Sequence, residues 1–181
     1  MNGTSQTRPL YWSIRREVWE NRFLYIAPLA VSAFVLFATF ASMLWTVSQK
    51  RMPVKPISMA PAPVMFTILL VGFFYTLDAL YGERRDRSIL FWKSLPVSDF
   101  TVVASKAAIP FVVLPLFSWL LSVTMQVVLL LLSSPVLLAN GISPASLASE
   151  MYFFEGLLIM FYGIGVHVLW FAPIYGWFIL V

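Results

Sequence analysis

The chain has 181 residues, of which 60% are hydrophobic and only 11% are charged, and its mean hydropathy is +0.85. Soluble domains carry about 25% charged residues, so this composition excludes a soluble globular protein and indicates an integral membrane protein. The net charge of +4 does not indicate nucleic-acid binding, because the basic residues flank apolar segments. The absence of cysteine excludes disulfides and thiolate chemistry.

The N-terminal residues 9–22 are predicted to form an interfacial helix ahead of the first membrane span. At about 100° per residue, such a helix has two apolar stripes separated by arginines. One stripe contains Leu10, Tyr11, Ile14 and Val18, the other contains Trp12, Trp19 and Phe23, and Arg15 and Arg22 lie between them. Arginine stems cover apolar surface while their guanidinium groups reach water, so this pattern suits the lipid headgroup region. The alternative is a simple arginine–tryptophan anchor for the first span.

Four segments are long and apolar enough to cross a bilayer, which needs about 20 residues of helix. They cover residues 24–47, 63–80, 107–132 and 156–181. Pro110 and Pro115 should kink the third span or mark a shallow start. After it, Ser133–Pro135 and Asn140–Gly141 are turn signals, and Ser143–Pro144 is typical of a helix start. We expect an all-α integral membrane protein with a single transmembrane domain.

Basic residues are distributed unequally on the two sides of these spans. Four precede the first span and five lie between Arg84 and Lys106, which places nine on one side, whereas residues 48–62 contain three and residues 133–152 none. Short loops rich in Lys and Arg stay in the cytoplasm. We therefore predict a multi-pass protein of the cell (inner, or cytoplasmic) membrane with a cytoplasmic N-terminus and a cytoplasmic loop 82–106.

That cytoplasmic loop also contains an apolar segment, Ile89–Trp92. A cytoplasmic helix that is apolar nearly all round must bury itself against the rest of the protein or against a partner. We expect a helix over Arg84–Ser94 that ends before Pro96, since the residue before a proline disfavours helical angles. A second helix should begin at the N-cap Ser98, with an acidic residue in its first turn, and run through Lys106 into the third span.

Three segments of the chain carry a resemblance to a known family. They are Ile14–Arg22 ahead of the first span, Glu83–Leu90 followed by Lys93–Ser98 in the cytoplasmic loop, and Trp170–Trp177 in the fourth span. Together they resemble the permease (transmembrane) subunit of an ABC-2 type ATP-binding-cassette transporter. The resemblance implies a pair of permeases, as a homodimer or heterodimer in the lipid bilayer, each with six spans and each forming half of an export pathway.

The resemblance also implies a separate ABC ATPase subunit, which would hold ATP and Mg and grip a coupling helix in the loop 82–106. The residues of this chain that would contact it are Glu83, Arg84, Arg85, Asp86, Arg87, Ile89, Leu90, Phe91, Trp92, Leu95 and Pro96. Because the chain ends at Val181, we expect it to be the N-terminal part of a longer permease. The transported substrate is not selected by any motif.

Motifs for catalysis do not occur in the sequence. A phosphate-binding loop needs Gly-Lys-Ser/Thr, and the only lysine followed by Ser or Thr is Lys93, which Trp92 precedes. His-Glu-x-x-His and Gly-x-Ser-x-Gly, which would indicate intramembrane proteolysis, do not occur. We predict that the chain itself is not an enzyme, with no catalytic residue, metal or cofactor.

Two polar residues within the spans form a weaker candidate site, because charged and polar groups in a membrane are costly and often functional. Asp78 lies in the last turn of the second span, where pairing with Arg84 or Arg85 is the expected role. His167 lies in the fourth span, where hydrogen-bonded packing is expected. The two glycines in 163–165 are expected to permit close helix contact.

The competing interpretation is a small four-span channel, or a membrane assembly or scaffold protein without ATP coupling. The feature that separates the two is the apolar segment Ile89–Trp92. A channel has no need of it, whereas an ATP-driven permease requires a surface of this kind. Purification after coexpression with neighbouring genes would distinguish them, because only the permease brings an ATPase with it.

Overall fold

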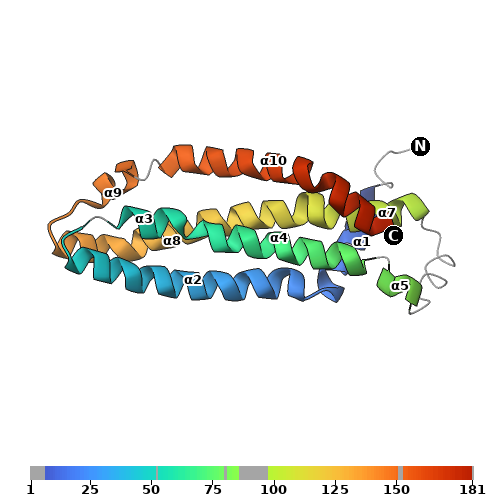
Figure 1. The fold of residues 1–181 in the computed structure, drawn as a ribbon, viewed down its shortest axis with the longest axis horizontal. Helices are drawn as coiled ribbons and strands as arrows, with labels where there is room; N and C mark the ends of the chain where they lie inside the picture. The colour runs from blue at the N-terminus through green and yellow to red at the C-terminus, as the bar shows by residue number, and fades with distance from the viewer. Residues whose placement is uncertain (1–6, 52, 80, 86–97, 151–152, 181) are drawn as a thin grey trace. The chain divides into compact units, whose positions relative to one another are not determined.

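The computed structural model describes residues 7–51, 53–79, 81–85, 98–150 and 153–180. All the regular secondary structure in these ranges is helical, and they contain no strand. The elements in chain order are α1 (Thr7–Glu20), α2 (Phe23–Ser48), α3 (Val54–Met59), α4 (Pro61–Asp78), α5 (Tyr81–Arg85), α7 (Asp99–Ala108), the π-helical turn η1 (Ile109–Val113), α8 (Leu114–Ala139), α9 (Pro144–Glu150) and α10 (Phe153–Leu180) (Figure 1).

Four helical stretches in the described ranges are long and apolar enough to cross a membrane. They are Phe23–Ser48, Ile57–Asp78, Asp99–Ala139 and Pro144–Ile179. Several of these helices expose large apolar side chains, among them Phe37 of α2, Leu131 of α8 and Trp170 of α10, as lipid-facing helices do. The predicted class, an all-helical membrane protein with four spans, is confirmed. The six-helix permease fold stays a prediction.

Helix boundaries differ from the prediction at the first connection. The predicted interfacial helix is α1, which we call the entry helix, and it ends at Glu20 instead of residue 22. At this end the side-chain amide of Asn21 donates to the carbonyl oxygen of Glu17 at 3.0 Å, beside the backbone N–H of Asn21 at 3.1 Å. These bonds satisfy a carbonyl that the helix end would otherwise leave open. The next helix, α2, then begins at Phe23, one residue before the predicted span.

The predicted turn at Ser133–Pro135 is wrong, because α8 continues through Pro135 to Ala139. The hydroxyl groups of Ser133 and Ser134 donate to the carbonyl oxygen of Leu130 instead of opening a turn, at 2.9 and 2.8 Å. Serine hydroxyls that donate to backbone carbonyl oxygens satisfy their own hydrogen-bonding groups inside the helix, so these two serines do not require a turn in apolar surroundings. The chain turns later, at Gly141, whose φ of 73° favours glycine.

One further expectation about local structure is confirmed, since a helix begins at Pro144 as the sequence predicted. The kink or shallow start expected at Pro110 and Pro115 stays a prediction: Pro115 lies in the first turn of α8, and Pro110 lies in the π-helical turn η1, between α7 and α8. Proline lacks the N–H that a regular helix would use at this position, and a wider turn accommodates the loss. Residues 48–62, predicted to be a loop, also contain the short helix α3.

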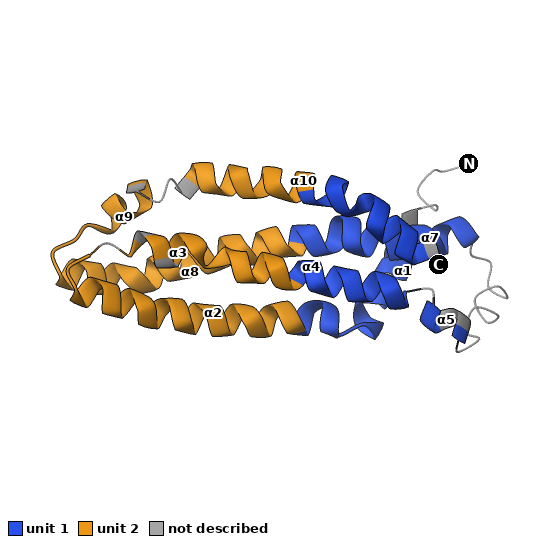
Figure 2. Cartoon of the chain, viewed as in Figure 1, with its two compact units in different colours: residues 1–26, 68–116, 167–181 blue, residues 27–67, 117–166 orange. Residues whose placement is uncertain are grey.

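The chain forms two compact units, which are coloured separately in Figure 2. Unit 1 contains residues 1–26, 68–116 and 167–181, and unit 2 contains residues 27–67 and 117–166. Each unit has its own buried apolar side chains. In unit 1 they include Leu24, Val71, Ile109 and Tyr175, and in unit 2 they include Met43, Val64, Met125 and Leu129.

Helices pack closely in unit 1 at Gly72 of α4. A Cβ added there would lie 3.3 Å from the hydroxyl oxygen of Tyr175 and 3.4 Å from Cδ1 of Leu114. Glycine therefore permits α4 to approach α10 and the start of α8. The close contact predicted at the two glycines in 163–165 is wrong for the described residues, since a Cβ added at either position would meet nothing within 4 Å.

Candidate functional site

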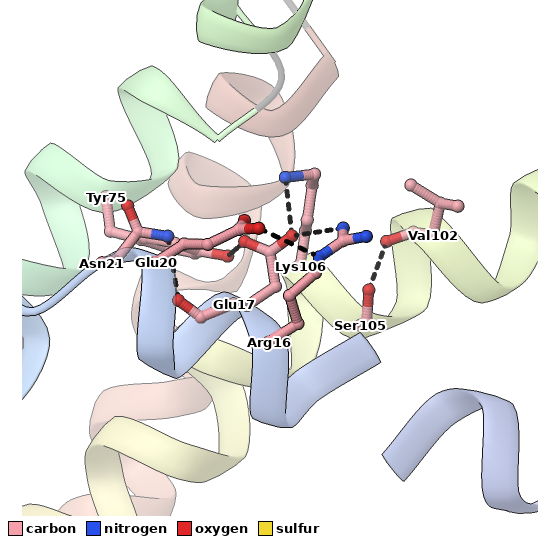
Figure 3. A network of polar contacts seen from close by, with 8 residues as sticks. All are labelled: Arg16, Glu17, Glu20, Asn21, Tyr75, Val102, Ser105 and Lys106. Atoms are coloured by element: carbon pink, nitrogen blue, oxygen red, sulfur yellow. Dashed lines mark hydrogen bonds and ion pairs between the residues drawn. The ribbon is translucent and has the colours of Figure 1, made fainter. Parts of the chain in front are cut away.

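A buried carboxylate, Glu17 of α1, joins three helices of unit 1. Lys106 Nζ of α7 donates to Glu17 Oε1 at 3.0 Å, and the hydroxyl of Tyr75 in α4 donates to Glu17 Oε2 at 3.0 Å (Figure 3). The exposed fractions are 2% for Glu17, 2% for Lys106 and 1% for Tyr75. We call these three residues the buried triad.

Local structure positions each member of the buried triad. The carbonyl oxygen of Glu17 accepts two hydrogen bonds from Asn21, which fixes the last turn of α1. Lys106 lies in the last turn of α7, which packs against α1. Tyr75 lies one turn before the end of α4. The buried triad thus gathers side chains from three helices that are far apart in the sequence.

The electrostatics of the buried triad explain why a charge can lie there. A buried carboxylate is costly unless it is paired and hydrogen-bonded. Here both oxygens of Glu17 have a partner at 3.0 Å, one charged and one neutral. Arg16 Nη2 lies 3.6 Å from Glu17 Oε1, and Arg16 Nε lies 3.5 Å from Glu20 Oε1 (Figure 3). Arg16 therefore links the buried carboxylate of Glu17 to the exposed carboxylate of Glu20.

The buried triad is suited to holding elements together. Both oxygens of its carboxylate are bonded, one to the ammonium and one to the phenol, so a single side chain links three helices. Within the described ranges, no group of three or more His, Asp or Glu side chains could hold a metal ion. The arrangement has a mechanical consequence, because displacing α7 from α1 would separate Glu17 from Lys106, its nearest charged partner.

The exposed side of α1 carries a second arrangement. The guanidinium carbon of Arg15 lies 5.3 Å from the ring centroid of Trp12 and 5.8 Å from that of Trp19. All three side chains are exposed, so the arginine is stacked between two aromatic rings on the outer face of the helix. This layout matches the tryptophan stripe predicted from the sequence and suits a helix in the lipid headgroup region.

The predicted ATPase-coupling residues lie mostly outside the described residues. Of that set, the structure places Glu83, Arg84 and Arg85 in α5. The residues outside the described ranges are Asp86, Arg87, Ile89, Leu90, Phe91, Trp92, Leu95 and Pro96. The expected helix over Arg84–Ser94 and its role in coupling therefore stay predictions.

The helix predicted to follow that segment is confirmed. Ser98 is the N-cap of α7, and its hydroxyl oxygen accepts from the backbone N–H of Thr101 at 3.2 Å. Asp99 lies in the first turn, where a carboxylate interacts favourably with the helix dipole, and Lys106 lies in the last turn. From Asp99 the helical path continues through η1 to Ala139, so the third apolar stretch begins eight residues before the predicted span 107–132.

The two polar residues of the weaker candidate site lie on different helices, Asp78 on α4 and His167 on α10. Asp78 is exposed at the end of α4, and a Cβ added at Gly82 of α5 would lie 3.1 Å from its Oδ1. The ring of His167 packs against Phe171, with centroids 4.6 Å apart, and lies edge-on to Tyr175. His167 therefore packs among aromatic rings. The roles of Asp78 and His167 as a polar site stay predictions.

Sequence reasoning missed Glu17 and Tyr75 and assigned Lys106 only a connecting role. One signal was available for Glu17. It lies seven residues after Leu10, which places an acidic residue on the same face as the apolar stripe of the entry helix. A charge at such a position requires a partner. Its partners could not be named, because they lie 58 and 89 residues further along the chain.

These observations define the class of the protein as helical and membrane-embedded, with an entry helix tied to the start of the third span. Compared with known proteins, the chain matches no family model, and no curated protein or solved structure is significantly similar to it.

Proposed function

We propose that this chain is the permease subunit of an ATP-driven exporter of the ABC-2 type, which pairs with a second permease and is driven by a separate ATPase subunit. The observation that carries the proposal is the buried ion pair between Glu17 and Lys106, with Tyr75 on the second carboxylate oxygen. It joins an entry helix to the helix that directly follows the predicted ATPase-binding segment.

The first supporting argument concerns the path from the cytoplasmic loop to the membrane. The segment Ile89–Trp92 is followed within a few residues by the capped start of α7 at Ser98. From there the helical path is unbroken to Ala139. A displacement at the start of a helix moves the whole helix, whereas a loop would absorb it. The π-helical turn η1 is the one irregular part of this path, and such turns often lie at functional sites.

The second supporting argument concerns the buried triad. Because Lys106 is held by Glu17, α7 cannot move away from α1 without separating two charges in an apolar environment. The Tyr75 hydroxyl ties the end of α4 to the same carboxylate. A push on the cytoplasmic loop would therefore reach the entry helix and two spans together, which is what coupling to an ATPase requires.

The third supporting argument is the outer face of α1. Its exposed Trp12, Arg15 and Trp19 suit the headgroup layer, where aromatic rings and arginine bind the lipid interface. An entry helix held by lipid on one face and by Lys106 on the other gives α7 a fixed point against which to move. The nine-to-three bias in basic residues favours a cytoplasmic N-terminus for this helix.

The experiment that tests the proposal is coexpression with the ATPase encoded nearby, followed by purification in detergent. We expect the ATPase to copurify, and the variant Leu90→Ala with Trp92→Ala to release it or to uncouple its hydrolysis from transport. Truncating an apolar anchor that fills a partner pocket costs about 2 kcal/mol or more. The matched control is Leu44→Ala with Trp45→Ala, an exposed pair on α2 at the opposite, extracytoplasmic end of the first span.

Two results would contradict the proposal. If no ATPase associates with the chain, the four-span channel or scaffold is favoured instead. If the complex and its substrate-stimulated ATP hydrolysis both survive the change at Leu90 and Trp92, while the control pair behaves identically, the coupling assignment is wrong.

A further inference from the structure

Three polar side chains are buried on one face of α8 in unit 2. They are Ser118, Ser122 and Gln126, with exposed fractions of 3%, 0% and 6%. A spacing of four residues places them in one row along the helix, next to the apolar Met125 and Leu129. Gln126 lies near the middle of the 26-residue helix, so the row lies deep in the span.

Two atoms of this row have no partner. Among the described residues, neither Ser122 Oγ nor Gln126 Oε1 has a hydrogen-bond partner, although both atoms are buried. The other end of the Gln126 amide meets only the thioether sulfur of Met160, at 4.0 Å. Exchanging the two amide atoms would leave both of them unsatisfied, because a thioether can accept a hydrogen bond but cannot donate one.

Neighbouring hydroxyl groups show that Ser122 differs from its surroundings. Thr124 Oγ1, two residues further on, donates to the carbonyl oxygen of Leu120 at 2.8 Å, and Ser134 Oγ donates to that of Leu130 at 2.8 Å. This backbone contact is the usual way for a hydroxyl to be satisfied within a membrane helix. Ser122 does not make it, so its hydroxyl is available to another group.

The row is covered by the first half of α10. Trp119 of α8 donates its indole N–H to the carbonyl oxygen of Leu157 at 3.5 Å, and its ring meets Phe161 edge to face, with centroids 5.9 Å apart. Met160, on the same stretch of α10, covers Gln126. The two helices are thus joined here by a long hydrogen bond, an edge-to-face ring contact and a contact to a thioether sulfur. Among the described residues no ion pair joins them, so the contact is weak.

We propose that Ser122 and Gln126 form an intramembrane site that binds an uncharged hydroxyl or amide group of a transported molecule at this weakly held contact with α10. Both residues offer donors and acceptors, and α8 carries no charged side chain, so the site suits a neutral hydrogen-bonding group and disfavours an ion. The inference rests on the proposed transport function, because it gives this row the role of a contact for cargo. Unsatisfied buried polar groups are costly and few in folded proteins, so two of them on successive turns of α8 require an explanation, which a hydrogen-bonding ligand supplies.

The test uses the absence of cysteine in the chain. Single variants Ser122→Cys and Gln126→Cys of the full chain are placed in liposomes and treated with 2-hydroxyethyl methanethiosulfonate, which is neutral and bears a hydroxyl. The controls are Thr124→Cys, on the exposed side of the same helix, and Leu129→Cys, buried on the same face at an apolar position. Thiols react as thiolates, which form only where water enters, so the two site variants should react about tenfold faster than both controls.

A second reagent tests the chemical class of the ligand. Each reagent's rate at a site variant is first divided by its rate with a free thiol in water. On this scale the cationic trimethylammonium methanethiosulfonate should react about tenfold more slowly than the neutral reagent, because the site offers no counter-charge. Site variants that react no faster than the Leu129→Cys control, or equally fast with both reagents, would overturn the proposal. No ATPase or nucleotide is present, so failure of the ATPase to bind the chain would leave this result unchanged.

Discussion

Removing the lysine of the buried triad is the most direct test of its energetics. In Lys106→Met, a long apolar side chain replaces the one that carries the ammonium group. The charged Glu17 stays buried at its own position. Breaking a buried ion pair in this way costs about 3–5 kcal/mol, because one charge remains uncompensated. Glu17 retains the hydroxyl of Tyr75 at 3.0 Å and the guanidinium of Arg16 at 3.6 Å. We therefore expect the lower end of this range.

A loss of about 3 kcal/mol corresponds to roughly a 150-fold change in the folding equilibrium. The free energy of unfolding is measured by titrating the purified chain in mixed micelles with a denaturing detergent and following tryptophan fluorescence. The matched control is Lys55→Met, an exposed lysine, for which surface substitutions predict a change within about 0.5 kcal/mol.

The double variant Glu17→Leu with Lys106→Met distinguishes an ion pair from simple packing. Replacing both charges by apolar groups of similar volume removes the stranded carboxylate, so most of the lost stability should return. A cost below about 1 kcal/mol for Lys106→Met would refute this reasoning, because buried charges left uncompensated cost more than that. A double variant less stable than the single one would refute it equally.

Three further predictions use matched positions. Gly72→Val should destabilise the chain by about 1–3 kcal/mol through overpacking, whereas Gly163→Val, in open space, should be close to neutral in the same unfolding titration. Ser98→Ala should lower the free energy of unfolding by about 1 kcal/mol through loss of the N-cap bond, and Ser98→Asp should retain it. In intact cells, an impermeant maleimide should label Ser58→Cys and not Ser88→Cys; the reverse pattern would invert the topology.

The parts of the fold that the sequence predicts well depend on local chemistry. The first span was predicted at 24–47 and is α2, Phe23–Ser48, because a long uncharged apolar run can only be satisfied as a membrane helix. The start of α7 was predicted from Ser98, a serine before an acidic first turn, and this cap needs no distant residue. Turn signals were less reliable at Ser133–Pro135, because in apolar surroundings serine hydroxyls bond within the helix.

The candidate site was harder to predict because its contacts are not local. Glu17 meets Tyr75 and Lys106 across 58 and 89 residues, and no periodic pattern carries that information. The sequence indicated only that Glu17 falls within an apolar stripe. The same limit applies to Gly72, whose close neighbour Tyr175 comes from another span. The glycines in 163–165 looked equally suitable as contact residues and face open space instead.

The use of a buried ion pair at this position has a physical explanation beyond stability. An apolar contact of equal volume would hold α1 on α7 about as strongly, because the desolvation of two charges offsets most of their attraction. Apolar faces, however, can slide past one another with little penalty, whereas Lys106 reaches Glu17 in only one register. The Tyr75 hydroxyl on the second oxygen fixes the orientation of the carboxylate as well. We infer that the buried triad sets the register of the entry helix against α7, so that a displacement of α7 moves α1 with it and is not lost as slippage.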